Sequence, residues 1–413
     1  MKSKITSIII ALLALCSVAP AQNTEYSTQY VKTITMHLPD SDFGYPICQL
    51  GEPISLEFDV LDDKYASLSY SIQHCNSEFE ADDLSFEEFA EGFNNRPVDE
   101  YNNSFNTLTQ YTHYSITIPN RDIKLLISGN YIINVYDDDN PDTPILSKRF
   151  MVYEDADNSK ITASITQPFL PEYQMQCQQI AVTFDNSRLK ISNPSKYLSI
   201  YAMQNGDYST RRRLPITGFL NNDILYHKND NENIFYGISE FHFLDAKDVH
   251  FRPLGVDAIL YRQGRYHYVL TPLEYSPNYS ETGDLNGNFY IKNDRAYNFA
   301  LESDYIDATF RFKYDAFTDC NIYLYGALTN WQRDSTSLLQ WNAESEVWEI
   351  TKTIKQGLYN YEFIVENPDG TFADFSSGSS HYTSNDYIIT VYTTFPHIRG
   401  ERLVMYKIVD RRK

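Results

Sequence analysis

Two acidic loops carry the densest grouping of side chains that can bind a metal ion. Asp137–Asp142 reads Asp-Asp-Asp-Asn-Pro-Asp, and Asp284–Asn288 reads Asp-Leu-Asn-Gly-Asn. Carboxylate and amide oxygens are the ligands that Ca²⁺ prefers, but neither loop has the ligand spacing of an EF-hand. The same residue types form ordinary turns between strands. We therefore expect turns at both places and no metal site.

Groups that could serve acid–base or nucleophilic catalysis are scattered along the chain. The nine histidines form no cluster, and His242 and His250 are eight residues apart with no cysteine beside them. HExxH, GxSxG, P-loop and GxGxxG motifs are all missing from the sequence. A carboxylate pair suited to glycoside hydrolysis is defined by its separation in space, which a sequence does not give. We expect no catalytic residue and no cofactor, and hence not an enzyme.

The charge of the chain bears on its partners. The net charge is −21, which repels nucleic acid and anionic lipid, so we expect neither as a partner. The basic triplet Arg211–Arg213 stands out against this background. A solvated turn between strands is the expected reading of the triplet, and a docking contact is the alternative.

Short segments in which apolar and polar residues alternate must position all of these groups. Examples are Val31–His37, Ile54–Val60, Leu198–Met203 and Tyr387–Tyr392. A period of two indicates half-buried strands. The 34 tyrosines and 24 phenylalanines suit such strands. The sequence predicts a mainly β fold of three consecutive β-sandwich domains, immunoglobulin-like or early-set, with little helix.

Polar hinges suggest where one sandwich ends and the next begins. Val152–Lys160 reads as a linker, and a second boundary is expected near Asn298–Asp304. The predicted domains are therefore 22–155, 156–300 and 301–413. One short helix is expected over Asp82–Phe93, where aspartates can cap the first turn.

The first 21 residues have the pattern of a secretory signal peptide. A basic head precedes the apolar run Ile8–Leu15, and Ala-Pro-Ala ends at Ala21. We expect cleavage near Ala21, export, and no integral membrane segment, since the apolar run is too short to span a bilayer. Cys16 follows a leucine, which lipoprotein processing accepts poorly, so lipidation of Cys16 remains an open alternative.

Four cysteines lie beyond this segment: Cys48, Cys75, Cys177 and Cys320. Their number is even, and an exported chain can form disulfides. Their spacing matches no zinc site. A local bridge between Cys48 and Cys75 and a set of buried free thiols are both compatible with the sequence.

The last third of the chain contains an aromatic pattern of its own. Trp331 follows a Gly-Ala-Leu-Thr-Asn turn, Gly357–Phe363 alternates Gly-x-Tyr-x-Tyr-x-Phe, and Phe372 lies in the next hairpin. The pattern resembles early-set sandwiches related to glycogen-binding modules, although Leu328 stands where that family has an aromatic residue. The resemblance implies that Trp331 and Phe372 could stack on a sugar. The same residues also serve as ordinary core and turn positions.

A longer series of motifs runs through almost the whole chain in a fixed order. These motifs are Gly51–Asp59, Tyr70–Asn76, Glu91–Phe93, Asp99–Tyr101, Ser104–Thr107, Tyr111–Tyr114, Pro119-Asn120, Ser128–Tyr131, Arg149-Phe150, Gln204-Asn205, Glu240-Phe241, Asp304-Tyr305 and Lys355–Gly357. In this order they resemble the plug-protein family of the type IX secretion system of Bacteroidota. Phe79 stands where we expect a tryptophan of that family, and it keeps an aromatic anchor there.

The resemblance implies a periplasmic, non-catalytic protein peripheral to the outer membrane. Such a plug binds the translocon β-barrel of the secretion system and closes its periplasmic side. The aromatic-rich loop Asn94–Tyr111 is the expected contact surface, with Arg96, Tyr101, Phe105 and Tyr111 as its candidate residues. The alternative for this loop is that it folds back on its own sandwich.

Two other roles remain open at this stage. The chain could be an exported glycan-binding protein that uses Trp331 and Phe372. It could also be a secreted cargo of the same system, which would carry a C-terminal sorting domain. The last hundred residues look like an integral sandwich, which favours the plug over the cargo.

Overall fold

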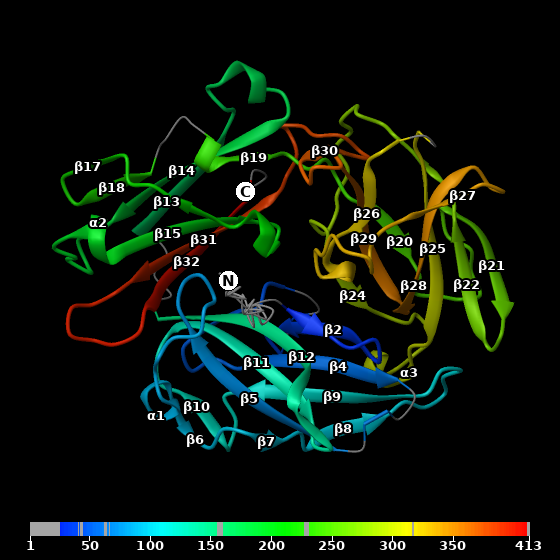
Figure 1. Cartoon of the computed structure of the whole chain (residues 1–413), viewed down its shortest axis with the longest axis horizontal. Helices are drawn as coiled ribbons and strands as arrows, with labels where there is room; N and C mark the ends of the chain where they lie inside the picture. The colour runs from blue at the N-terminus through cyan, green and yellow to red at the C-terminus, as the bar shows by residue number, and fades with distance from the viewer. Residues whose placement is uncertain are drawn as a thin grey trace, which may run out of the picture.

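The computed structural model describes residues 25–39, 41, 44–61, 64–65, 67–154, 160–226, 231–315 and 318–410. Within these residues the chain is mainly β, with three α-helices of four residues each. Three β-sandwiches are arranged as a triangle around a common centre (Figure 1). The expected mainly β fold with little helix is confirmed. The expected signal peptide, its cleavage near Ala21 and Cys16 lie outside the described residues.

The first sandwich, residues 25–154, packs two sheets around one apolar core. Its first sheet has β1 (Tyr26–Ser27), β12 (Asn140–Tyr153), β11 (Gly129–Asp137), β5 (Leu68–Cys75) and β7 (Arg96–Pro97) in this order, with β3 (Ile47–Gln49) beside β12. Its second sheet has β2 (Val31–His37), β4 (Ile54–Leu61), β9 (Tyr111–Ile118) and β8 (Glu100–Asn103). A pair of short strands, β6 (Ala90–Gly92) and β10 (Ile123–Leu125), completes it.

The second sandwich combines the middle of the chain with its C-terminal strands. One sheet has β13 (Ile161–Thr166), β14 (Cys177–Asp185), β18 (Asp223–Tyr226) and β17 (Gly218–Leu220), with β19 (Ile234–Tyr236) beside β14. The other has β16 (Arg212–Leu214), β15 (Leu198–Gln204), β31 (Asp386–Thr393) and β32 (Arg402–Asp410). Both sheets contribute to one core, which includes side chains from β31 and β32.

The third sandwich is formed by residues 238–380. One sheet has β20 (His242–Asp245), β29 (Gly357–Glu366) and β24 (Phe289–Ile291), with β26 (Asn321–Tyr325) and β30 (Phe372–Phe375) also paired to β29. The other has β21 (Val256–Arg262), β22 (Arg265–Leu270), β25 (Tyr305–Lys313), β28 (Val347–Lys355) and β27 (Gln340–Asn342), with β23 (Leu273–Glu274) beside β25. Apolar residues of both sheets meet in its core.

The strands are therefore distributed differently from the three contiguous domains expected at 22–155, 156–300 and 301–413. β31 pairs with β15 over seven residues, so the C-terminal strands belong to the second sandwich. β20, β21 and β22 pair with strands of the third sandwich, so that unit begins well before residue 301. Figure 1 shows this exchange as red C-terminal strands lying among the green strands of the middle segment.

The helix expected over Asp82–Phe93 is reduced to α1 (Phe86–Phe89). Ser85 and Glu88 form a capping box that starts this single turn. Ala90 then adopts an extended conformation and pairs with Leu125, which ends the helix. The other two helices, α2 (Pro194–Tyr197) and α3 (Phe299–Glu302), are equally short.

An apolar cluster joins the first sandwich to the second. The members from the first sandwich include Ile132 and Met151, and those from the second include Ile388 and Tyr392. The Tyr392 hydroxyl donates a hydrogen bond to Asn130 Oδ1 at 2.8 Å across the same boundary. Burial of apolar surface on this scale favours a fixed arrangement of the two sandwiches over independent motion.

Cys48, Cys75, Cys177 and Cys320 are free thiols. The first three are about 1 % exposed, and burial raises the pKa of Cys48 and Cys75 to about 12 and that of Cys177 to about 11.

In folded protein lacking residues 1–21, a thiol reagent at pH 8 should therefore modify Cys320 about a hundredfold faster, or more, than it modifies the three buried cysteines. Denaturant should expose all four. The variant C320S should lose the fast phase, and a denatured count below four would contradict the prediction.

Candidate functional site

A charged cluster is buried where the first sandwich meets the third. Asp59 lies on the face of β4 that points away from its own core, and Lys355 at the end of β28 places Nζ 2.7 Å from its Oδ2. The hydroxyl of Tyr305, from β25, donates to the same oxygen at 2.6 Å. The side chains of Asp59 and Lys355 are 0 % and 1 % exposed, so the ion pair is shielded from water.

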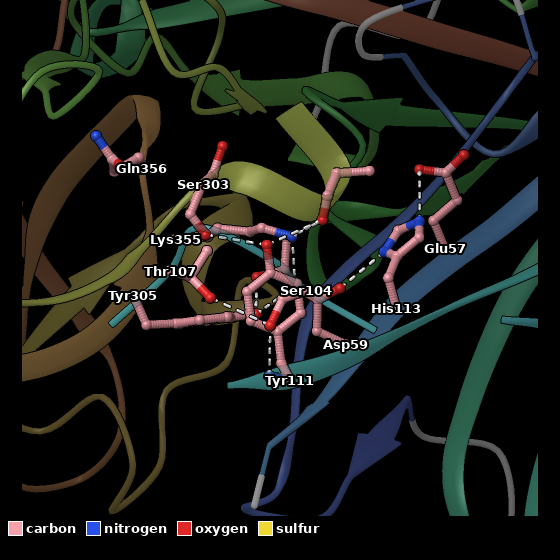
Figure 2. Close-up of polar contacts among 12 residues, drawn as sticks. Glu57, Asp59, Ser104, Thr107, Tyr111, His113, Ser303, Tyr305, Lys355 and Gln356 are labelled. Atoms are coloured by element: carbon pink, nitrogen blue, oxygen red, sulfur yellow. Dashed lines mark hydrogen bonds and ion pairs between the residues drawn. The ribbon is translucent and has the colours of Figure 1, made fainter. Parts of the chain in front are cut away.

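Neighbouring groups satisfy the other polar atoms of the pair, as Figure 2 shows. His113, the cross-strand neighbour of Asp59, lies 2.7 Å from Asp59 Oδ1 through Nδ1. Lys355 Nζ also donates to the carbonyl of Ala300 at 2.6 Å and lies 4.1 Å from the ring centroid of Tyr111. Burial lowers the pKa of Lys355, and the charge of Asp59 opposes that effect. The cluster is thus a fully bonded link between two domains.

Tyr111, one of the expected partner contacts, belongs to this buried link. It is 1 % exposed, and its hydroxyl lies 3.0 Å from the carbonyl oxygens of Ala300 and Ser303, to which it can donate. Burial raises the pKa of Tyr111, so the hydroxyl stays protonated at neutral pH. The residue joins the first and third sandwiches and does not face an external partner.

The remainder of the Asn94–Tyr111 loop divides into two parts. Asn94 donates to and accepts from the backbone of Ile72, so the loop begins folded against its own sandwich. Arg96 follows in β7 and forms an ion pair of 3.4 Å with Asp122. Beyond β8, the backbone N–H of Phe105 donates to Leu301 O at 3.1 Å, which docks this part on the third sandwich.

The two segments that meet here expose aromatic and aliphatic side chains. The carboxylate of Glu302 accepts hydrogen bonds from the Asn106 side chain at 3.3 Å and from the backbone N–H of Tyr297 at 3.1 Å, so it ties two surface segments together. We refer to the exposed apolar residues of the two segments as the aromatic patch: Tyr101, Phe105, Leu108, Tyr297 and Phe299. Tyr297 is 99 % exposed. Single exposed apolar residues are common, but a group of this kind often marks an interaction surface.

The two residues expected to stack on a glycan lie near domain boundaries. Trp331 packs edge-on against Phe241 and Tyr325, with ring centroids 6.0 and 5.0 Å apart. Phe372 packs against Tyr236 of the second sandwich at 4.4 Å. Both belong to the margin of one apolar cluster and are half-buried. Contacts within the protein therefore cover part of each ring.

The acidic loop that begins at Asp284 and the surroundings of His242 have structural partners. Asp284 Oδ2 accepts the backbone N–H of Phe241 at 2.7 Å, which fixes the loop that begins there. Glu362 is fully buried beside His242, and it accepts hydrogen bonds from the hydroxyls of Ser376 and Ser377. Across the described part of the chain, no three His, Cys, Asp or Glu side chains come together in a way that could hold a metal ion.

The basic triplet differs from the solvated turn expected for it. Arg211 lies 3.7 Å from the ring centroid of Tyr201 and pairs with Glu78 of the first sandwich at 3.5 Å. Arg212 begins β16 and donates to the carbonyl of Ile234 at 2.5 Å. Of the three residues, Arg213 alone is exposed. Aromatic rings on β15 and β19 account for this burial, because they offer faces on which guanidinium groups stack.

Sequence reasoning did not single out Asp59, His113 or Lys355 as a group. Each of them nevertheless belongs to one of the motifs that carried the family resemblance, as do Tyr111 and Tyr305. These motifs are up to about 300 residues apart in the chain and meet in a single cluster (Figure 2). The motifs therefore contained the residues of the cluster. Sequence alone did not show that these residues meet, because their contact depends on how the sandwiches pack.

Residues 31–154 match the model of the type 9 secretion system plug protein 1st domain. These residues therefore form a plug domain of the type IX secretion system kind. The matched residues span nearly all of the first sandwich, including β2 to β12. This match supports the family that the sequence motifs led us to expect. The plug domain associates the chain with the secretion system and suggests a location in the cell envelope.

A solved structure extends the similarity beyond the plug domain. The crystal structure of a hypothetical protein from Parabacteroides merdae ATCC 43184 superposes with a TM-score of 0.88 and 27 % identity, covering 93 % of this chain and 98 % of that chain. The arrangement of all three sandwiches is thus shared. No curated protein matches the chain. In the part that the structure describes, helices long and apolar enough to cross a membrane do not occur.

Proposed function

We propose that this protein is a periplasmic, non-catalytic plug that binds the outer-membrane translocon barrel of the type IX secretion system and closes its periplasmic side. The observation that carries the proposal is the match of residues 31–154 to the plug domain. Export by a signal peptide that is cleaved near Ala21 would bring the protein to the periplasm. It would remain peripheral to the outer membrane.

The packing of the sandwiches supports this role. A body that closes a pore must keep its shape while it is bound, and two buried boundaries hold this one together. The Asp59–Lys355 pair joins the first sandwich to the third, and the cluster around Met151 and Tyr392 joins the first to the second. The interfaces combine apolar burial with bonded polar groups, which is typical of fixed domain contacts.

The aromatic patch is the surface that we propose for contact with the barrel. It retains Tyr101 and Phe105 of the residues expected from the sequence and adds Leu108, Tyr297 and Phe299. Tyrosine and phenylalanine are enriched at interfaces, where a few aromatic anchors contribute most of the binding energy. Arg96 lies at the base of the same loop and is a candidate for the rim of the contact. Tyr111 contributes by holding the loop against the third sandwich.

The experiment that tests the proposal is affinity purification of the tagged protein from gently solubilised outer membranes of its host. Recovery of a very large β-barrel, increased when cargo is absent, is the expected result. Recovery of the protein alone, from the soluble periplasm or the medium, would overturn the proposal. Starch or glycogen retardation in a native gel would then be the next measurement, because it tests glycan binding through Trp331 and Phe372.

Substitutions in the aromatic patch should weaken barrel recovery without unfolding the protein. Phe105→Asp combined with Tyr297→Asp places charge at two anchors, and we expect binding to fall about thirtyfold or more. Phe219→Asp is the matched control, since Phe219 is similarly exposed on β17 of the second sandwich. Quantitative pull-down measures barrel recovery. If the control and the double variant lose recovery equally, the aromatic patch is not part of the interface.

The secreted-cargo alternative has less support. A cargo carries its sorting domain as an appendage, whereas β32 pairs with β31 over the length of the strand and contributes Val404 and Met405 to the core of the second sandwich.

A further inference from the structure

A cleft of about 360 Å³ lies where the three sandwiches meet. The first sandwich lines it with Lys148 and Arg149, the second with Asp207 and Tyr208, and the third with Trp331. Pockets that hold small molecules have volumes of about 300–1,000 Å³. Because no single sandwich forms this cleft, anything bound there would touch all three.

Arg149 is the most unusual residue of the cleft. Its guanidinium carbon lies 5.1 Å from the ring centroid of Phe79 and 5.0 Å from that of Tyr208. Its Nε is buried without a hydrogen-bond partner, and within the described residues its guanidinium forms no ion pair. An arginine that is stacked on rings and lacks a carboxylate is ready to bind an anion through its fork of donors.

A second unpartnered donor lies beside the first. Tyr208 lines the cleft, and its hydroxyl is buried and has no hydrogen-bond partner. Burial raises the pKa of Tyr208, so its hydroxyl is a donor at neutral pH. Buried polar atoms are nearly always bonded, and two exceptions on residues that stack on each other call for an explanation.

The acidic groups of the cleft have partners. Glu25 pairs with Lys148 Nζ at 2.9 Å and also accepts the backbone N–H of Arg149. Asp207 accepts hydrogen bonds from Tyr325 and Ser209, and burial raises the pKa of Asp207. Neither carboxylate is bonded to the guanidinium of Arg149, which leaves that charge available to a ligand.

We propose that this cleft binds a small anion whose carboxylate or phosphate group accepts hydrogen bonds from Arg149 and Tyr208 and whose remaining atoms pack against Trp331. Residues Asn330 and Trp331 both have positive φ angles, 52° and 58°, which is rare for a residue as bulky as tryptophan. This backbone places Trp331 at the cleft. An anion bound here would contact all three sandwiches and raise the thermal stability of the protein.

Calorimetric titration and thermal unfolding of the purified protein test the site. The probes are inorganic phosphate, citrate, and a short N-acetylated peptide with a free C-terminal carboxylate, so that phosphate and carboxylate sources are distinguished. We expect at least one probe to bind and to raise the unfolding temperature. Arg149→Gln should weaken that binding about tenfold or more, because it removes charge-assisted hydrogen bonds.

Tyr208→Phe provides the sharper variant, since it removes an unpartnered hydroxyl and keeps the ring beneath Arg149. We expect unchanged or higher stability without ligand, and binding that is about three- to tenfold weaker. Arg213→Gln, which removes an exposed arginine outside the cleft, should change neither quantity. If no probe binds at millimolar concentration, or if Tyr208→Phe and Arg213→Gln behave alike, the proposal is wrong.

Discussion

Replacement of Lys355 by methionine is expected to destabilise the protein by about 3–5 kcal/mol, because it leaves Asp59 buried without its cation. Methionine keeps most of the side-chain volume, so the loss would report on charge and hydrogen bonds and only slightly on packing. Chemical unfolding followed by circular dichroism measures the change. The boundary between the first and third sandwiches should also become more accessible to protease.

Two comparisons make this prediction specific. Lys313→Met breaks an exposed pair with Glu274, whose side chains are 53 % and 72 % exposed, and should cost less than about 1 kcal/mol. Asp59→Asn combined with Lys355→Met should cost less than the sum of the single changes, because neither buried charge is then left alone. If Lys355→Met and Lys313→Met have equal effects, the buried pair does not hold the sandwiches together.

The charged cluster shows what strand periodicity can and cannot predict. Alternation over Ile54–Val60 correctly predicts β4 and correctly separates Phe58, which lies in the core, from Asp59 on the opposite face. The pattern by itself indicates that Asp59 faces water. The third sandwich covers that face instead, and no residue near Asp59 in the chain signals this. Local sequence therefore predicts the face of the strand and misses what packs on it.

The expected contact loop illustrates the same limit. Aromatic residues between Asn94 and Tyr111 correctly point to a surface with exposed rings, since Tyr101 and Phe105 are more than two-fifths exposed. Tyr111 has the same chemistry and is buried, because the carbonyls of α3 and the residue after it reach over it. Tyr297, the most exposed ring beside this loop, lies almost 200 residues further along the chain. A surface made by two domains cannot be found from one loop.

The order of strands along the chain does not show which strands share a sandwich. Alternation predicts the strand at Tyr387–Tyr392 as well as those around it, but a strand pattern does not say which sheet accepts the strand. The two faces of β31 pack against different sandwiches. Tyr387, Ile389 and Val391 point into the core of the second sandwich, whereas Ile388 and Tyr392 contact the first.

Truncation after Asn385 is accordingly expected to unfold the second sandwich, although a contiguous domain at 301–413 would predict damage to the third. The deletion removes β31 and β32, which form half of one sheet. It also removes the buried core side chains Tyr387, Ile389, Val391, Val404 and Met405. At about 1.5–3 kcal/mol for each large apolar side chain, the loss is about 7–15 kcal/mol, comparable to the whole stability of a domain.

Limited proteolysis with mass spectrometry measures this outcome segment by segment. Residues 160–226 should become cleavable in the truncated chain, because β15 loses its partner β31 and the facing sheet loses its cover. A chain that ends at Asp410 is the control and should resist protease like the full chain, since it keeps both strands. Persistent protection of 160–226 after truncation at Asn385 would mean that the second sandwich folds without β31. The long-range pairing would then be an addition to that domain and not part of its core.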